Sequence, residues 1–139
     1  MKKLLWQKTM TKTDAQRQKG NPTGDLRLTR AKYKINGKNI DQTEYFRNQV
    51  FGNLEWSCIN QDTGKEVCES NFEIFFDNEK YGERILQISH KPLGEAGQSN
   101  YTTGIRWGPW LSHLLIHEID CTGKIVSLFS DNNYIIEIS

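Results

Sequence analysis

The chain has 139 residues and a formal net charge of +1. This length is sufficient for one domain with its own core, and we expect a single domain over residues 1–139. There is no apolar run of roughly 18 residues and no signal-peptide pattern at the start, so neither a membrane span nor secretion is predicted. Cys58, Cys68 and Cys121 have no disulfide-framework spacing, which indicates a reducing, cytoplasmic setting.

The charge is distributed unevenly. The first 34 residues contain ten Lys or Arg and two Asp, a net of +8, whereas the remaining 105 contain eight basic and fifteen acidic residues, a net of −7. A basic end on an acidic body is typical of a protein that binds a polyanion, nucleic acid above all. The alternative is a solvated basic segment without a partner.

The first predicted strand, Leu4–Met10, is followed by the polar stretch TKTDAQRQKGNPTG at residues 11–24. This stretch has no large apolar side chain, so we expect a loop before the next strand, Asp25–Tyr33. Its residues are of the types that read base edges, with Arg or Lys for guanine, Asn or Gln for adenine and Asp for cytosine. The alternative role of Asp14 is to cap the turn. The candidate DNA contacts are Lys12, Thr13, Asp14, Gln16, Arg17, Gln18, Lys19, Asn21 and Thr23.

Basic residues around this loop are candidate phosphate or flanking contacts, although ordinary surface charge is an equal alternative. They are Lys2, Lys3, Lys8, Arg27, Arg30 and Lys32.

Asp41 begins the clearest helix signal. Asp41 and Glu44 have capping-box spacing, and Phe46 and Val50 would share one face. We predict a helix over 42–51 that ends at Gly52.

The rest of the chain predicts mostly strands. One strand is predicted over residues 54–60. Phe72, Ile74 and Phe76 alternate with other residues in a second strand, and after a turn at 77–82 a third strand is expected over 83–90, which completes a hairpin. Further strands are expected at 105–107, 114–119, 125–129 and 134–138, with a short helical turn near Pro109 and Trp110. About eight strands and one clear helix predict a mainly β, barrel-like fold.

A second long polar loop, KPLGEAGQSNYTT, spans residues 91–103. The alternative to a binding role is a hydrated, glycine-rich surface loop. Its candidate DNA contacts, with one residue just beyond it, are Glu95, Gln98, Ser99, Asn100, Tyr101, Thr102, Thr103 and Arg106.

Three segments, TKTDAQRQKGNPTGDLRLTRA (11–31), IDQTEYFRNQVF (40–51) and GEAGQSNYTTGIRWG (94–108), resemble the B3-like DNA-recognition domain of NgoFVII-type restriction endonucleases. The resemblance implies a seven-stranded pseudobarrel with one or two short helices. It also implies that two arms enter the major groove of double-stranded DNA, an N-arm at about 11–24 and a C-arm at about 91–103.

Full-length members of this family carry a metal-independent nuclease domain of the phospholipase D type with an H-x-K motif. This chain has adjacent His90 and Lys91 but no H-x-K. We therefore expect a recognition module without catalysis or cofactor, which either stands alone or belongs to a larger restriction enzyme.

Two other functions remain open. One is a β-barrel that binds single-stranded nucleic acid by stacking on its Trp and Tyr side chains. The other is a small hydrolase that uses His113, His117 and Glu118. A zinc site at His113, His117 and Cys121 is not expected, because on a strand the two histidines would lie about 13 Å apart.

Overall fold

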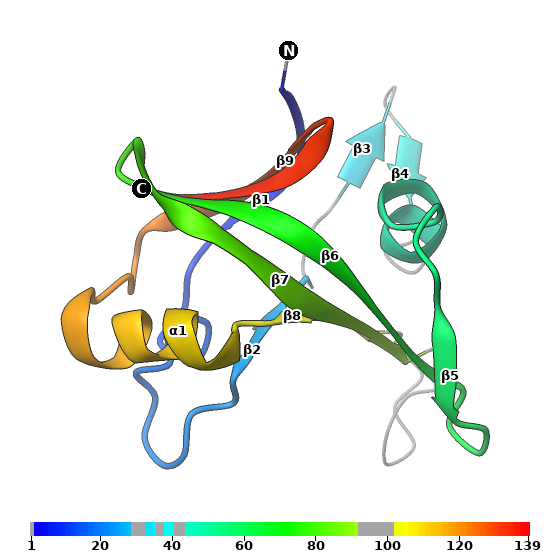
Figure 1. Ribbon diagram of the computed structural model, residues 1–139, viewed down its shortest axis with the longest axis horizontal. Coiled ribbons are helices and arrows are strands. Elements are labelled where there is room, and N and C mark those ends of the chain that lie inside the picture. Colours follow the sequence, from blue (N-terminus) through cyan, green and yellow to red (C-terminus); the bar gives the residue numbers. More distant parts are fainter. Residues whose placement is uncertain (1, 29–32, 36–37, 41–43, 92–101) are drawn as a thin grey trace.

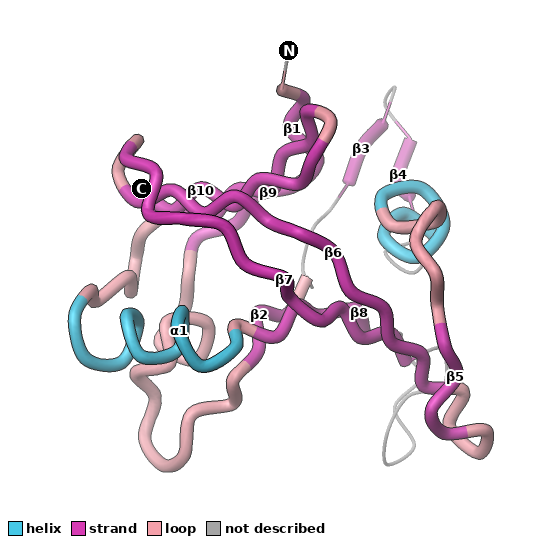
Figure 2. The backbone as a smooth tube through the Cα atoms, in the orientation of Figure 1, coloured by secondary structure: helices cyan, strands magenta, loops and turns pink. Residues whose placement is uncertain are grey.

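The computed structural model describes residues 2–28, 33–35, 38–40, 44–91 and 102–139, and most of them lie in strands (Figures 1 and 2). The strands are β1 (Lys3–Thr9), β2 (Asp25–Arg27), β3 (Tyr33–Ile35), β4 (Lys38–Ile40), β5 (Ser57–Asn60), β6 (Lys65–Phe76), β7 (Glu79–Lys91), β8 (Thr102–Arg106), β9 (Ile125–Asp131) and β10 (Asn133–Ile138). The helical segments are η1 (Glu44–Val50), α1 (Gly108–His113) and η3 (Leu114–Glu118). The predicted mainly β class is confirmed.

One sheet connects eight of the described strands in the order β1-β9-β10-β6-β7-β8-β2, and β5 pairs with the first part of β6. The β10–β6 pair is parallel, and the other pairs of this sheet are antiparallel. The sheet curls into a half-barrel (Figure 1). Strands β3 and β4 form a separate two-stranded sheet.

Strands β6 and β7 form a long hairpin. The predicted alternation is confirmed, because Phe72, Ile74 and Phe76 of β6 are all buried. The turn is tighter than the predicted 77–82: Asp77 and Asn78 have φ values of 49° and 69°, and β7 begins at Glu79. Two successive residues with positive φ are typical of a two-residue hairpin turn.

The sheet wraps a core of large side chains. Trp6 of β1, Phe46 and Phe51 around η1, Phe72 of β6 and Trp107 after β8 are each at most 2% exposed, and all belong to one cluster. The five side chains come from segments far apart in the sequence, so the core fixes how those segments are arranged. It thereby positions the loops that the sheet carries.

The predicted helix over 42–51 is confirmed for its described part, η1. Its buried face includes Phe46 and Val50, as expected. Phe51 N donates to Phe46 O over five residues, so the helix is wider than an α-helix. The proposed cap at Asp41 lies outside the described residues.

The strand predicted over 114–119 is wrong, because all of this segment except Ile119 forms the helix η3. Leu111, Leu114 and Leu115 are buried, and their spacing of three and four residues places them on one helical face. A short apolar run does not by itself distinguish a buried strand from a helix. The short helical turn predicted near Pro109 is confirmed as α1, and η3 continues it.

Within the part of the chain that the structure describes, none of the helices has the length and apolar character needed to cross a membrane.

Candidate nucleic-acid interface

The loop over residues 11–24, which we call the N-arm, joins β1 to β2 and begins with a hydrogen-bonded turn. The Asp14 carboxylate accepts hydrogen bonds of 3.0 Å from both the main-chain N–H and the hydroxyl of Thr11. The Thr11 hydroxyl oxygen in turn accepts from Asp14 N at 3.2 Å. This reciprocal pattern resembles a helix capping box, and it fixes the first turn of the arm.

Asp14 is a structural residue of the arm. It is 4% exposed, and its carboxylate lies 2.9 Å from Lys8 Nζ. Its main-chain oxygen accepts a hydrogen bond of 3.1 Å from Trp107 Nε1, which ties the arm to the end of β8. With both carboxylate oxygens engaged inside the protein, Asp14 takes the capping role rather than the contact to cytosine.

Gln16 is also internal, at 3% exposed, and it closes the arm on itself. Its Nε2 donates to Thr13 O at 2.8 Å and to Thr23 Oγ1 at 3.2 Å, and its Oε1 accepts from Gly24 N at 2.6 Å. Gln16 has a φ of 61°, which is uncommon for a residue with a side chain, and these bonds hold it there. In this conformation its amide is not free to read adenine.

Arg17 attaches the arm to the helical segment. Its Nε donates a 2.7 Å hydrogen bond to Leu115 O in η3, and the side chain is half-buried. The Nη groups carry the rest of the guanidinium donors, so Arg17 can anchor the arm and still present donors at its surface.

Beyond Arg17 the arm becomes an exposed tip. Gln18 Nε2 donates to Asn21 O at 2.9 Å, and Gly20 turns the chain with a φ of 86°. Lys19 has no ion pair among the described residues. Of the predicted contacts in the arm, the side chains that face solvent are Lys12, Thr13, Lys19, Asn21 and Thr23.

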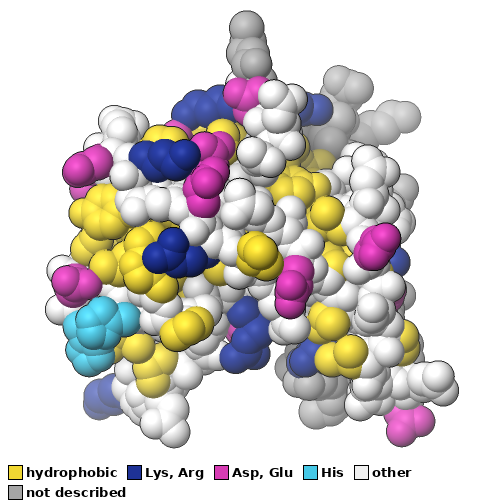
Figure 3. Space-filling view, viewed as in Figure 1, with side chains coloured by type: hydrophobic (Ala, Val, Ile, Leu, Met, Phe, Trp, Pro, Cys, Tyr) yellow, Lys and Arg dark blue, Asp and Glu magenta, His cyan; other side chains and the backbone are white. Residues whose placement is uncertain are grey.

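The arm re-enters the sheet beside β8, and two more basic side chains lie there. Asp25 pairs in register with Arg106, and Arg27 pairs with Gly104. Both arginines are exposed, whereas Leu26 and Ile105 between them are buried. Figure 3 shows basic side chains at a hollow in the lower edge of the molecule, where Figure 1 places β2 and β8.

The second predicted arm is described only at its ends. Lys91 ends β7 and pairs with Thr102, which begins β8. Thr103 is 1% exposed and its hydroxyl lies 2.9 Å from His90 Nδ1, so its side chain supports the base of this loop instead of facing a ligand. The other candidates of this loop, Glu95, Gln98, Ser99, Asn100 and Tyr101, lie outside the described residues.

Several predicted phosphate contacts have partners within the protein. Lys2 lies 2.5 Å from Glu137. Lys8 contacts Asp14 and also donates to Arg27 O at 2.7 Å. Arg30 and Lys32 lie outside the described residues. Arg27 remains an exposed candidate.

The tryptophans are poor stacking platforms for single-stranded nucleic acid. Trp6 and Trp107 are buried. Trp56 is half-buried with the Arg47 guanidinium 4.5 Å from its ring centroid, and Trp110 has Arg84 at 4.0 Å. An arginine therefore already occupies one face of each of these two rings.

His113 and His117 lie together on the helical segment, with ring centroids 4.9 Å apart, because η3 is a helix and not a strand. The premise of a 13 Å separation was therefore wrong. Cys121, the third residue of that motif, is fully buried. Within the described part of the chain, no group of three or more His, Cys, Asp or Glu side chains is arranged to hold a metal ion.

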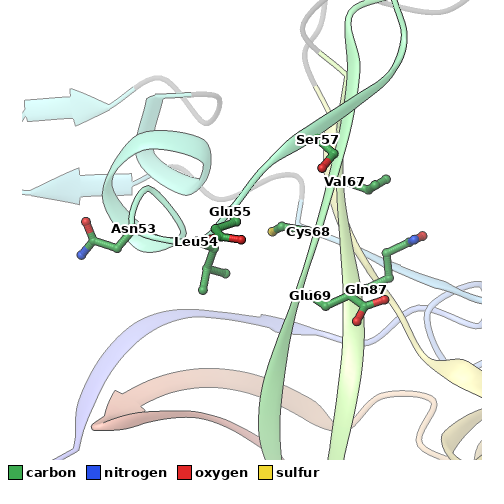
Figure 4. A pocket seen from close by; sticks show the side chains of 8 residues that line it. All are labelled: Asn53, Leu54, Glu55, Ser57, Val67, Cys68, Glu69 and Gln87. Atoms are coloured by element: carbon green, nitrogen blue, oxygen red, sulfur yellow. The ribbon is translucent and has the colours of Figure 1, made fainter.

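A cavity of about 520 Å³ lies on the β5-β6-β7 part of the sheet (Figure 4). Burial raises the pKa of the Cys68 thiol at its wall to about 12, so this thiol is a poor nucleophile near neutral pH. Among the described residues, two carboxylates but no Lys, Arg or His line this cavity. Its lining residues are Asn53, Leu54, Glu55, Ser57, Val67, Cys68, Glu69 and Gln87.

Comparison with family models, curated proteins and solved structures gives no match for this chain. The support for a nucleic-acid interface therefore comes from the geometry of this chain alone. Sequence reasoning located the arm, but it missed Asp25 and Trp107. Asp25 contacts Arg106, and Trp107 contacts Asp14, so both have partners far away in the sequence. Only the pairing of β2 with β8 brings these partners together at the arm.

Proposed function

We propose that this protein binds double-stranded DNA in a sequence-specific manner, with the N-arm in the major groove, as the recognition module of a restriction system. The observation that carries this proposal is the construction of the arm. Its base is tied to the body by Asp14 and Arg17 and is closed on itself by Gln16, and its tip exposes Lys19 and Asn21. A pre-organised loop loses less conformational entropy on binding than a flexible one.

The charge arrangement supports the same function. The first 34 residues contain only two acids, and each lies within ion-pair distance of a base: Asp14 beside Lys8 at 2.9 Å and Asp25 beside Arg106 at 3.6 Å. Their negative charges are thus compensated locally. Lys12, Lys19 and Arg27 stay exposed to attract the phosphate backbone, which dominates affinity for DNA.

The position of the two polar loops supports a B3-like pseudobarrel with two arms. The N-arm enters the sheet at Asp25, opposite Arg106, and the second loop enters at Thr102. These points are four residues apart along β8, or about 13 Å at strand rise. The major groove of B-DNA is about 12 Å wide. The separation of the two points is close to this width, so two arms that leave the sheet there could contact the same groove.

Selection from a randomised duplex library at about 0.15 M salt, a physiological ionic strength, tests this proposal. We expect the bound pool to be enriched in a short motif. Binding without enrichment that vanishes as salt rises would reduce the interface to a non-specific basic patch.

Competition between duplex and single-stranded DNA of the same sequence separates the proposal from the stacking alternative. We expect the duplex to compete far better, because the tryptophan rings are buried or covered by arginine. Stronger competition by the single strand would favour the alternative.

A further inference from the structure

We propose that Asp25 is a positioning residue, which orients the Arg106 guanidinium at the foot of the N-arm for a bidentate contact to a guanine. This inference depends on the proposed function and adds to it a base-reading residue and the group that aims it. Arg106 would then specify sequence, where a simple phosphate contact would only add affinity.

The pairing of β2 with β8 places the two side chains together. Asp25 and Arg106 are directly paired in antiparallel register, and Asp25 Oδ1 lies 3.6 Å from Arg106 Nη1. The Arg106 side chain is 53% exposed, so its remaining donors face solvent. Because a guanidinium has five N–H donors, it can turn one edge to a carboxylate and another to a guanine.

The Asp25 carboxylate has an unused acceptor. Oδ1 is inaccessible to solvent and has no hydrogen-bond partner among the described residues, because its 3.6 Å separation from Arg106 Nη1 is within ion-pair distance but too long for a hydrogen bond. A small movement of Arg106 toward Asp25 would satisfy this oxygen. We infer that DNA binding completes this bond, since a buried acceptor gains most when a charged donor reaches it.

The arm fixes the main chain of Asp25. Asp25 N donates to Thr23 Oγ1 at 3.3 Å, and Gln16 Nε2 donates to Asp25 O at 3.4 Å. Trp107 N, next to Arg106, donates to Gly24 O at 2.8 Å. The carboxylate and the guanidinium are therefore held in one framework with the arm.

The guanidinium lies close to Gly24. A Cβ at Gly24 would lie 3.4 Å from Arg106 Nη2, and Gly24 has a φ of 77° that side chains rarely adopt. Arg106 thus lies over the point where the arm meets the sheet, on the route into the groove that we propose for the arm.

The test uses the enriched site from the duplex selection. Dissociation constants are measured for that site, for its single-base variants and for random duplex, with the wild type, Arg106→Lys, Arg106→Ala, Asp25→Asn and the double variant Asp25→Asn/Arg106→Ala. We expect Arg106→Ala and Arg106→Lys to weaken cognate binding by about 10- to 100-fold and to lose discrimination at one G·C pair, because lysine cannot reproduce the bidentate geometry.

Asp25→Asn gives the decisive result. We expect this variant to lose discrimination at the same G·C pair. Its affinity for random duplex should equal or exceed that of wild type, because one negative charge is removed. In the double variant, Asp25→Asn should add little further loss to Arg106→Ala, since both act on one contact. A merely structural role for Asp25 would weaken both duplexes equally.

Glu83→Gln is the matched control, because Glu83 is an exposed carboxylate 3.7 Å from Lys80 on the distant hairpin. Thermal unfolding of each variant confirms that it folds, and Arg106→Lys tests the contact even if Asp25→Asn does not fold. If the wild type selects no motif, the proposed function fails and this inference with it. If the wild type selects a motif but Asp25→Asn and the Arg106 variants keep full discrimination, only this inference is overturned.

Discussion

Trp107 Nε1 donates a 3.1 Å hydrogen bond to the main-chain oxygen of Asp14, which joins the end of β8 to the N-arm across 93 residues of sequence. Both residues are buried. The bond supplies the partner that the buried indole N–H needs, and it holds the first turn of the arm against the sheet. The shape of the arm is therefore coupled to the core.

We predict that Trp107→Phe destabilises the protein by about 1–3 kcal/mol, because it leaves the Asp14 carbonyl without its indole donor. Urea unfolding measures this change. The arm should also be cut faster by trypsin at Lys12, Arg17 and Lys19. Trp110→Phe is the control, since Trp110 packs against Arg84 rather than the arm. Equal cleavage rates in wild type and Trp107→Phe would show that this bond does not hold the arm.

The sequence was sufficient to locate the strands whose burial alternates. Phe72, Ile74 and Phe76 of β6 carry a period of two, and turn residues follow them. The sequence pattern predicted the wrong structure for 114–119, where five helical residues continue from α1. The buried side chains there have helical spacing from Leu111. An apolar run this short shows neither the period of a strand nor that of a helix, so its structure follows from the helix that precedes it.

The arm was predictable from composition, but the roles of its residues were not. Asp14, Gln16, Lys19 and Asn21 are all polar, and nothing local distinguishes the first two, which are buried, from the last two, which are exposed. The difference comes from partners such as Trp107, which the fold supplies from elsewhere in the chain.

Lys19 and Arg17 should respond differently to truncation. Lys19→Ala removes an exposed side chain, so we expect cognate affinity to fall roughly 5- to 50-fold more than affinity for random duplex, with unchanged stability. Arg17→Ala should relax specificity more than it lowers non-specific binding, and it should also reduce stability, since Leu115 O loses its donor.

Binding isotherms on both duplexes, with urea unfolding of each variant, check this contrast between Lys19 and Arg17. Lys80→Ala is the control for loss of a surface lysine, because Lys80 pairs with Glu73 on the distant hairpin. Equal losses of Lys19→Ala on cognate and random duplex would make Lys19 a phosphate contact.

The three cysteines should differ in reactivity. Burial raises the pKa of Cys68 to about 12 and that of Cys121 to about 11, whereas Cys58 is exposed on β5. Because the thiolate is the reactive form, we expect one thiol to react rapidly with an aromatic disulfide reagent in the native protein and three in urea. Cys58→Ser should abolish the rapid phase. A rapid phase that survives this substitution would contradict the buried placement of the other two.

His90 predicts a pH dependence of stability. It is 2% exposed, and burial lowers its pKa below the ordinary value of 6.5; the Arg47 charge lowers it further, and the Glu66 carboxylate opposes both effects. The folded state therefore keeps His90 neutral, while the unfolded chain takes up a proton as the pH falls through 6.5. Stability is complete above that pH and declines below it, by at most about 1.4 kcal/mol per pH unit.

Urea unfolding of wild type and His90→Gln between about pH 7.5 and pH 5 measures this effect. We expect the variant to be less stable at pH 7.5, because the packing of His90 against Trp56 and its contact with Thr103 are altered. Its stability should fall less steeply toward pH 5, since no buried imidazole resists protonation. His113→Gln is the control for replacing a histidine by glutamine, because His113 is exposed on α1. Parallel pH profiles for wild type and His90→Gln would mean that His90 takes up its proton equally well in the folded and unfolded chains.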